Sequence, residues 1–425
     1  MLAQMERRGL DVLCVYADRE HGGNFGYLTG FEPRFEEALL VLHRTGKAFL
    51  LLGNESLRMG AYSRLENTVI HVPHFSLPNQ PMEPQVPFAQ LLADAGLCPG
   101  MHAGIAGWKM FTSEKEDNAQ LYDVPHFIVE AIKNQVESCV SCGGLFIHCE
   151  HGVRVVNNAN EIAHFEYGAA LASDCVMTAL HRAAVGSTEL EVADALAIHG
   201  QPVTVQTICA AGERFTDGEV APRNKKLALG DTFSVTMGLR GGLTSRAGYI
   251  AASKQDLPEN VRDYMDVVAK PYFAAAVMWL ETIGLGVTGD TLYSAVNGVI
   301  PREDFGWTLN PGHLTASEEW LSSPIAPGSP VAIKSGMLFQ LDILPRRPGY
   351  GGANAEDGVA IADAQLRQEL AAKYPQVWQR MQRRREYLIQ VLGIRLKPEV
   401  LPMSDTVGYL QPYILDPSMA LYVKR

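Results

Sequence analysis

The sequence predicts an α+β protein built from two domains, and three observations support this prediction. The chain has 425 residues, which at about 150 residues per domain is enough for two or three domains with cores of their own. Apolar runs of strand length alternate with helical patterns in the first third, which indicates an α/β domain over residues 1–140. Over residues 155–425, long helical patterns separated by groups of strands favour helices packed on one curved sheet.

The elements of the first domain follow from its apolar runs. An amphipathic helix opens the chain, and a second helix is expected over Pro87–Ala95, after a proline-rich loop at Leu77–Pro87. Strands are predicted at Val12–Tyr16, Ala38–His43, Ala48–Leu52 and Thr68–Val72. The pattern changes between Phe127 and Ala159, where we expect the domain junction.

The second domain is expected to begin with a long helix. From Asn160 onward apolar residues return to one helical face, until Gly186–Glu189 ends this helix and caps the next one. Further helices are predicted at Val261–Leu280 and Val377–Leu392, and strands at Val203–Cys209, Thr232–Val235, Leu338–Leu344 and Gly358–Ile361.

Composition and charge exclude several classes of partner. Hydrophobic residues make up 47% and charged residues 20%, as in ordinary globular proteins, and the formal net charge is -11. This acidic balance has the wrong sign for nucleic acids or anionic membranes, and the longest apolar stretches fall short of the roughly 20 residues that span a bilayer. Seven cysteines are scattered along the chain, which favours reduced thiols. We therefore expect a cytoplasmic protein with a small-molecule partner, and neither nucleic acid nor membrane.

Four short patterns in the C-terminal half carry the information about function. They are Gly212–Pro222 with Leu229–Asp231, Val235–Gly238, Asn310–His313, and Gly336–Asp342 followed by Ala355–Gly358. Their order and spacing resemble those of the creatinase, prolidase and aminopeptidase P family of peptidases and related hydrolases. Tyr27–Phe31 is similar to the family's N-terminal signature, so the resemblance covers most of the chain. It implies a creatinase-like N-terminal domain and a C-terminal "pita-bread" domain, which methionine aminopeptidase shares.

The resemblance also implies positions for metal ligands. The peptidases of this family hold two metal ions with two Asp, one His and two Glu, because several hard carboxylates are needed to bridge paired cations. His313 matches the ligand His, and Asp342 and Glu356 match the two Glu. Thr236 stands at the first Asp, and Arg246 falls on the second Asp if one residue is deleted. An Arg there would repel a cation, so we expect neither a dinuclear centre nor another cofactor. A single divalent ion on His313, Asp342 and Glu356 remains the alternative.

Further site residues follow from the same resemblance. Glu219 stands three residues before Pro222, where the family often has its catalytic His. Since creatinase works without metal, Glu219, His313, Asp342 and Glu356 are expected to be catalytic and to handle protons. Arg240, Arg246 and Thr236 are expected to bind the substrate. In creatinase-like dimers an N-domain loop reaches the partner's active site, which implies a homodimer with a shared active site and Arg34 as a clamp for a substrate carboxylate.

Structural interpretations stand beside these functional ones. His313 could lie in a turn with a solvated imidazole, Glu356 could be an exposed turn carboxylate, and Arg246 could be a surface residue of a glycine-rich loop. Asp342 differs, because an ionised side chain in its apolar strand is costly unless it is paired. We favour function for Asp342, His313 and Glu356, and leave Arg246 open.

A second cluster could bind zinc. Cys139, Cys142, His148, Cys149 and His151 lie within a short segment, and Cys-x-x-Cys is a common pair of zinc ligands. The last three are expected on a strand, where alternation points Cys149 away from its neighbours. We therefore favour buried thiols over a zinc site.

The sequence thus predicts a creatinase-like hydrolase of a C–N bond in a small carboxylate-bearing metabolite, without a dinuclear metal centre. Two alternatives stay open. One is an Xaa-Pro metallopeptidase of the aminopeptidase P or prolidase type. The other is a ligand-binding pseudoenzyme or a lyase on the same fold, because a fold by itself does not fix the chemistry of its site.

Overall fold

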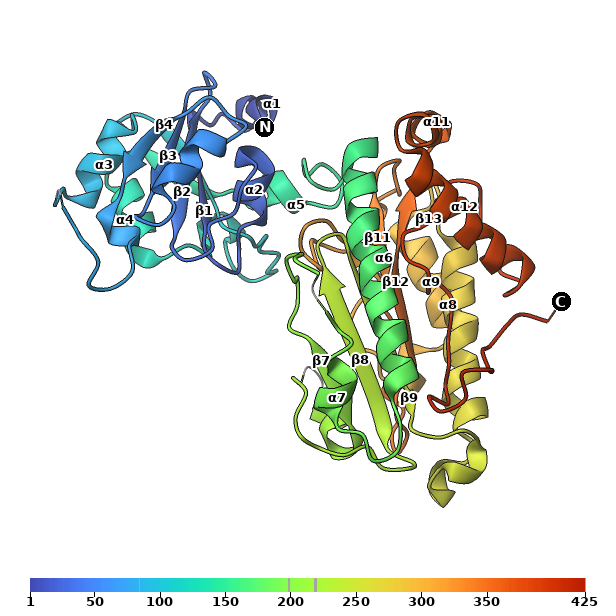
Figure 1. Cartoon of the computed structure of the whole chain (residues 1–425). Helices are drawn as coiled ribbons and strands as arrows, with labels where there is room; N and C mark the ends of the chain where they lie inside the picture. Colours follow the sequence, from blue (N-terminus) through green and yellow to red (C-terminus); the bar gives the residue numbers. More distant parts are fainter. Residues whose placement is uncertain (84, 198, 218–219, 425) are drawn as a thin grey trace. The chain divides into compact units, whose positions relative to one another are not determined.

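The computed structural model describes residues 1–83, 85–197, 199–217 and 220–424. The chain divides into two compact units, Met1–Arg154 and Val155–Arg425, which are coloured along the sequence in Figure 1. Each unit has its own sheet and helices, which agrees with the predicted α+β class. Among the described residues, no helix is both long enough and apolar enough to cross a bilayer.

The first unit is a mixed six-stranded sheet with the strand order β4-β3-β2-β1-β5-β6. The central strand β1 pairs antiparallel with β2 and parallel with β5, and all its side chains except that of Tyr16 are completely buried. The strands are β1 (Val12–Ala17), β2 (Ala38–His43), β3 (Ala48–Leu52), β4 (Thr68–His71), β5 (His102–Ala106) and β6 (Ser138–Ser141). The four strands predicted from apolar runs are therefore confirmed to within one residue at each end.

Helices cover this sheet. Leu92 of α3 and Ile128 of α4 are fully buried in the same core cluster as β1. The helices are α1 (Leu2–Arg7), α2 (Gly23–Thr29), α3 (Phe88–Asp94), α4 (His126–Lys133) and α5 (Gly144–Ile147).

The second unit is built on a seven-stranded sheet with the order β10-β11-β12-β9-β8-β7, in which β13 also pairs with β12. All neighbouring strands are antiparallel. The strands are β7 (Ile208–Ala211), β8 (Thr232–Leu239), β9 (Gly242–Tyr249), β10 (His313–Leu314), β11 (Leu338–Leu341), β12 (Asn354–Ile361) and β13 (Val400–Pro402). The predicted strand at Val203–Cys209 starts too early, because β7 begins at Ile208.

The long helix α6 (Ala159–Arg182) lies against β8 and β9 (Figure 1). Asn158 and Glu161 form a capping box at its start, which satisfies backbone N–H groups that the first turn leaves free. A Cβ atom on Gly168 would lie 2.0 Å from the carbonyl oxygen of Arg240, so a glycine is needed where α6 meets the β8–β9 turn. The helix therefore fixes the hairpin whose strands carry one side of the site.

The remaining helices pack around this sheet. They are α7 (Glu189–Ala193), α8 (Lys270–Thr282), α9 (Gly289–Val299), α10 (Arg302–Phe305), α11 (Ala364–Lys373) and α12 (Pro375–Gln390). The helix predicted from Val261 begins later, because a π-helical turn at Met265–Ala269 precedes α8. The predicted cap at Gly186–Glu189 is confirmed, since Thr188 and Glu191 form a capping box on α7.

Candidate functional site

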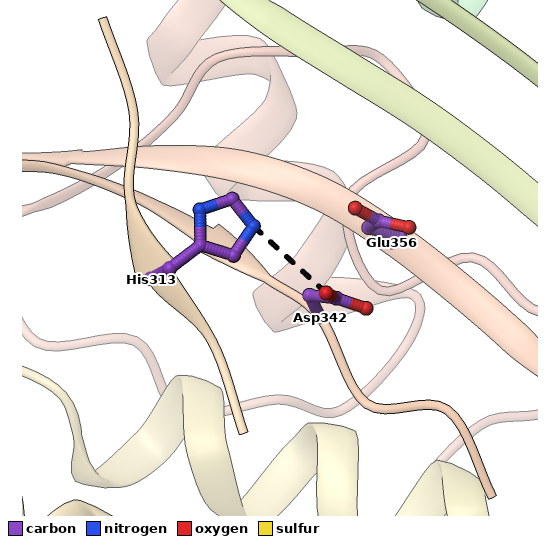
Figure 2. Close-up of side chains that lie close together, drawn as sticks. All are labelled: His313, Asp342 and Glu356. Atoms are coloured by element: carbon purple, nitrogen blue, oxygen red, sulfur yellow. Dashed lines mark ion pairs between the residues drawn. The ribbon is translucent and has the colours of Figure 1, made fainter. Parts of the chain in front are cut away.

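Three titratable side chains converge on neighbouring strands of the second unit (Figure 2). His313 begins β10, Asp342 follows β11, and Glu356 lies in β12. They are 0%, 4% and 6% exposed, and one potential ligand atom of each lies within 4.8 Å of the others. The interpretations of His313 as a solvated turn residue and of Glu356 as an exposed turn carboxylate are therefore wrong.

Sheet pairing explains why these residues meet. His313 pairs with Gln340 on β11, and Gln340 pairs with Gly358 on β12, so the three strands lie side by side. Gly312 has φ +109°, and a Cβ atom there would lie 2.7 Å from the carbonyl oxygen of Gln340. Only glycine allows this turn and this close approach, so the Asn-Pro-Gly-His pattern is what places His313 against β11.

The imidazole of His313 is held on several sides. Its Nδ1 lies 3.2 Å from the carbonyl oxygen of Leu314, and its ring stacks on Trp320 with centroids 4.0 Å apart. Nε2 lies 2.9 Å from Glu319 Oε1 and 3.9 Å from Asp342 Oδ2. Glu319 is thus a fourth member of the cluster. The Ser317–Trp320 segment has no His and offered no spacing from which its place could be inferred.

Burial and mutual repulsion change the protonation of these groups. Burial, reinforced by the charge of Glu319, raises the pKa of Asp342 to about 6, although His313 acts to lower it. Burial and the charges of Asp342 and Glu319 raise the pKa of Glu356 well above its ordinary value. Burial alone would lower the pKa of His313, but the negative charges of Glu319 and Asp342 outweigh it and raise this pKa. Without a cation, Asp342 and Glu356 therefore keep their protons to a higher pH than ordinary carboxyl groups do.

A row of neutral polar side chains continues the site across the sheet. Thr236 on β8 pairs with Ser245 on β9, which pairs with Glu356 on β12, so the three share one face. The Thr236 and Ser245 hydroxyl oxygens lie 2.7 Å apart. Asn354, two residues before Glu356, donates to Ser245 Oγ at 3.1 Å and to Glu356 Oε2 at 3.4 Å. Hydroxyls and an amide therefore stand beside the carboxylates.

The prediction that Arg246 takes the second Asp position is wrong. Side chains alternate along a strand, and Ser245 is the residue that faces Thr236 and Glu356. Arg246 is 1% exposed and forms an ion pair with Asp357 on the opposite face. The proposed deletion shifted the sequence match by one residue, so the expected repulsion of a metal by Arg246 does not apply. Its interpretation as a surface residue is also wrong.

The Arg246–Asp357 pair forms several further hydrogen bonds, although Arg246 Nε has no partner among the described residues. Arg246 donates to the carbonyl oxygens of Ser245 at 2.6 Å, Glu356 at 3.1 Å and Thr406 at 2.6 Å. Asp357 accepts from the hydroxyls of Thr244, Ser404 and Thr406. The guanidinium of Arg246 therefore links β9 to β12 on the face of the sheet opposite the site.

The other predicted residues lie in the β8–β9 turn, in the first unit, or outside the described residues. Arg240 lies in the β8–β9 turn beside α6. Burial lowers the pKa of His164, and the charge of Arg240 lowers it further. Arg34 belongs to the first unit, is exposed and donates to the carbonyl oxygen of Arg19 at 3.3 Å. Glu219 lies outside the described residues, so its predicted role stays a prediction.

The cysteine and histidine cluster does not form a metal site among the described residues. Cys139 lies on β6 and Cys142 just after it, and burial raises the pKa of both thiols to about 11. His148 follows α5 rather than lying on a strand, and its ring stacks on that of His151 at 3.8 Å. Within the described ranges, the set whose ligand atoms converge is His313, Asp342 and Glu356.

The donor set fits one divalent cation and does not fit two. Nε2 of His313 and Oδ1 of Asp342 are buried and have no hydrogen-bond partner among the described residues. Buried polar atoms are normally satisfied, and an imidazole with carboxylates is a common set for a divalent metal. A second ion would need charged ligands where Thr236 and Ser245 offer hydroxyls.

Comparisons with known proteins agree at the level of the fold. No family model and no curated protein matches the sequence. Among solved structures, the chain is similar to prolidase from Pyrococcus furiosus, with 18% identity over 85% of this chain and 97% of that one and a TM-score of 0.65. It is also similar to an Xaa-Pro dipeptidase from Bacillus anthracis (16% identity, 86% and 94% covered, TM-score 0.63) and to an X-Pro aminopeptidase from Thermotoga maritima (15%, 85% and 94%, 0.63). This chain has the fold of the creatinase and prolidase family, with the pita-bread architecture in its second unit.

Proposed function

We propose that the protein hydrolyses a C–N bond of a small carboxylate-bearing metabolite, at a centre that does not hold two metal ions. The observation that carries this proposal is the His313–Asp342–Glu356 cluster beside the hydroxyl pair of Thr236 and Ser245. Three of the five ligand positions of a dinuclear hydrolase carry a metal-binding side chain here, and hydroxyls stand at the other two.

The cluster needs a positive charge to be fully ionised. Asp342, Glu356 and Glu319 bring three carboxylates to one imidazole, and Arg246 compensates Asp357 on the other face. One divalent cation held by His313, Asp342 and Glu356 would supply that charge and a Lewis acid that polarises a carbonyl. A cationic nitrogen of the substrate would also satisfy the carboxylates electrostatically.

The chain's own groups can move the protons that C–N hydrolysis requires. In the metal-free centre, Glu356, whose pKa burial raises well above its ordinary value, is suited to donate a proton to the leaving nitrogen. Asp342, with a pKa of about 6, is suited to accept a proton from the attacking water. His313 positions Asp342 and is fixed by Trp320 and Leu314. Glu219 is kept as a further candidate base.

We further propose that Arg34 of a second copy holds the substrate carboxylate, in a homodimer with shared active sites. Arg34 is exposed and its neighbour Phe35 is 70% exposed, which suits a loop that meets another chain. Thr236, 5% exposed on the site face, is kept as a substrate contact. A cytoplasmic location belongs to the same proposal, because all seven cysteines are free thiols.

The proposal is tested by turnover of N-acyl and N-amidino amino acids with metal-free and metal-loaded protein. Asp342→Asn and His313→Ala are each expected to abolish turnover, while Glu303→Gln, an exposed carboxylate on α10, should not change it. Turnover that survives both substitutions in the cluster would contradict the proposed roles.

A second candidate is an Xaa-Pro peptidase, which the fold comparisons favour. The same assay with proline dipeptides and short Xaa-Pro peptides separates the two. If protein with one bound metal ion cleaves these peptides but does not hydrolyse the N-amidino amino acids, the peptidase function is selected.

A further inference from the structure

We propose that Glu319 is the fourth protein ligand of a single divalent cation bound by His313, Asp342 and Glu356. The inference rests on the proposed function only for the place of the site. It adds a residue that lies in a different segment from the three ligands inferred by resemblance.

The first argument is a distance. Ligand atoms lie about 2.0–2.2 Å from such an ion, so two ligands of the same ion are roughly 3–3.5 Å apart. Glu319 Oε1 lies 2.9 Å from His313 Nε2, and Asp342 Oδ2 lies 3.9 Å from the same nitrogen. Both carboxylates therefore lie near the Nε2 atom that would bind a cation. The side chain of Glu319 has to turn towards Asp342 and Glu356, since the ligand atoms that already converge within 4.8 Å are those of His313, Asp342 and Glu356.

The second argument is an unsatisfied atom. Although Glu319 Oε1 is so close, Nε2 of His313 has no hydrogen-bond partner among the described residues, so the two atoms approach each other outside hydrogen-bond geometry. Asp342 Oδ1 is buried and unpartnered as well. A cation lying between them would satisfy both atoms at once.

The third argument is that the local backbone fixes Glu319. The amide of Leu314 donates to the carbonyl oxygen of Ser322, and the amide of Leu321 donates to the carbonyl oxygen of Leu314. Thr315 Oγ1 closes the loop by donating to the carbonyl oxygen of Glu318 at 3.0 Å. The loop therefore holds Glu319 beside Nε2 of the imidazole. The side chain of Glu319 is 20% exposed, which leaves a route for an ion.

The fourth argument is charge. Three carboxylates and one neutral imidazole offer hard oxygen and borderline nitrogen donors, a set that suits Zn²⁺ or Mn²⁺. Binding by four side chains of this kind leaves room for a water or substrate atom in an expanded coordination shell.

The experiment measures metal binding without turnover. Chelator-treated full-length protein is titrated calorimetrically with Mn²⁺ or with Zn²⁺ alone, for wild type, Glu319→Gln and the matched control Glu318→Gln. Wild type should bind one equivalent. Glu319→Gln should bind it at least about 10-fold more weakly, since even groups that only orient ligands contribute 10- to 100-fold. Glu318→Gln, which removes the same charge one residue away, should retain wild-type affinity.

Thermal unfolding of each protein with and without the ion supplies a second readout and verifies folding. The stabilisation by metal should be smaller for Glu319→Gln than for Glu318→Gln. Equal affinity in Glu319→Gln and wild type, equal losses in both variants, or a wild type that binds no ion would each overturn the ligand role. Because the readout is metal binding and not turnover, each of these results would leave the proposed hydrolysis standing.

Discussion

The hydroxyl oxygens of Thr236 and Ser245 lie 2.7 Å apart on adjacent strands, in register with Glu356. Two ionised carboxylates could not occupy these positions so closely without a cation between them, because their repulsion is strong in a buried site. Asn354 adds an N–H donor on the same face, so its positive end faces Ser245 and Glu356. Neutral side chains that hydrogen-bond to one another thus stand where a second metal ion would need charged ligands.

Thr236→Asp combined with Ser245→Asp should therefore create room for a second ion. Metal analysis after dialysis against Mn²⁺ should rise from one equivalent to two, and metal-free protein should unfold at a lower temperature because two buried carboxylates are added. Thr308→Asp, at an exposed position, is the control and should change neither quantity. A double variant that folds and still binds one equivalent would argue against this interpretation of the hydroxyl pair.

The contribution of Asp342 to the stability of metal-free protein should fall as pH rises from about 4 to about 6. Asp342 has an ordinary pKa of 3.8 in the unfolded chain and about 6 in the folded one, so in this window the folded state binds more protons. Raising the pH then costs folding free energy, and Asp342→Asn removes this contribution. Urea unfolding in chelator at several pH values measures it, with Asp304→Asn as a surface control. Parallel pH profiles for wild type and Asp342→Asn would count against the assigned environment.

Arg246→Met should destabilise the protein by about 3–5 kcal/mol, because it leaves Asp357 buried without its cation. Metal stoichiometry should not change, since the guanidinium lies on the other face of the sheet. Arg240→Met, in the hairpin turn, should cost about 1 kcal/mol or less. Denaturant unfolding and metal analysis of both variants check these expectations, and a change of stoichiometry in Arg246→Met would refute the separation of the two faces.

Replacing Cys139 and Cys142 together by Ser should leave the zinc content of the protein unchanged. Burial raises the pKa of both thiols to about 11, so they remain protonated near neutral pH, whereas zinc binds the thiolate. Elemental analysis of the two purified proteins decides the question. A loss of one zinc equivalent would reinstate the cluster as a site.

Apolar runs predicted β1 to β4, because β1 to β3 are buried along almost their whole length and β4 is partly buried. His313, Asp342 and Glu356 were placed together by the resemblance to a known family, and the structure brings these three side chains together. Arg246 was misplaced because successive side chains of a strand point to opposite faces. A one-residue error in the sequence match therefore puts a residue on the wrong face of the sheet. Glu319 and Asn354 were missed because their place depends on a loop and on cross-strand contacts, which leave no periodic signal.

Glu356 and Asp357 are adjacent, yet one carboxylate enters the site and the other is neutralised by Arg246. A slip of β12 by one residue would bring Glu356 to the guanidinium and leave Asp357 without its three hydroxyl donors. A one-residue slip thus costs electrostatic energy, in addition to the cost of turning apolar side chains to the wrong face of the sheet. The buried ion pair can act as a check on correct strand assembly during folding, so that only chains in the native register present the uncompensated carboxylate where chemistry can use it.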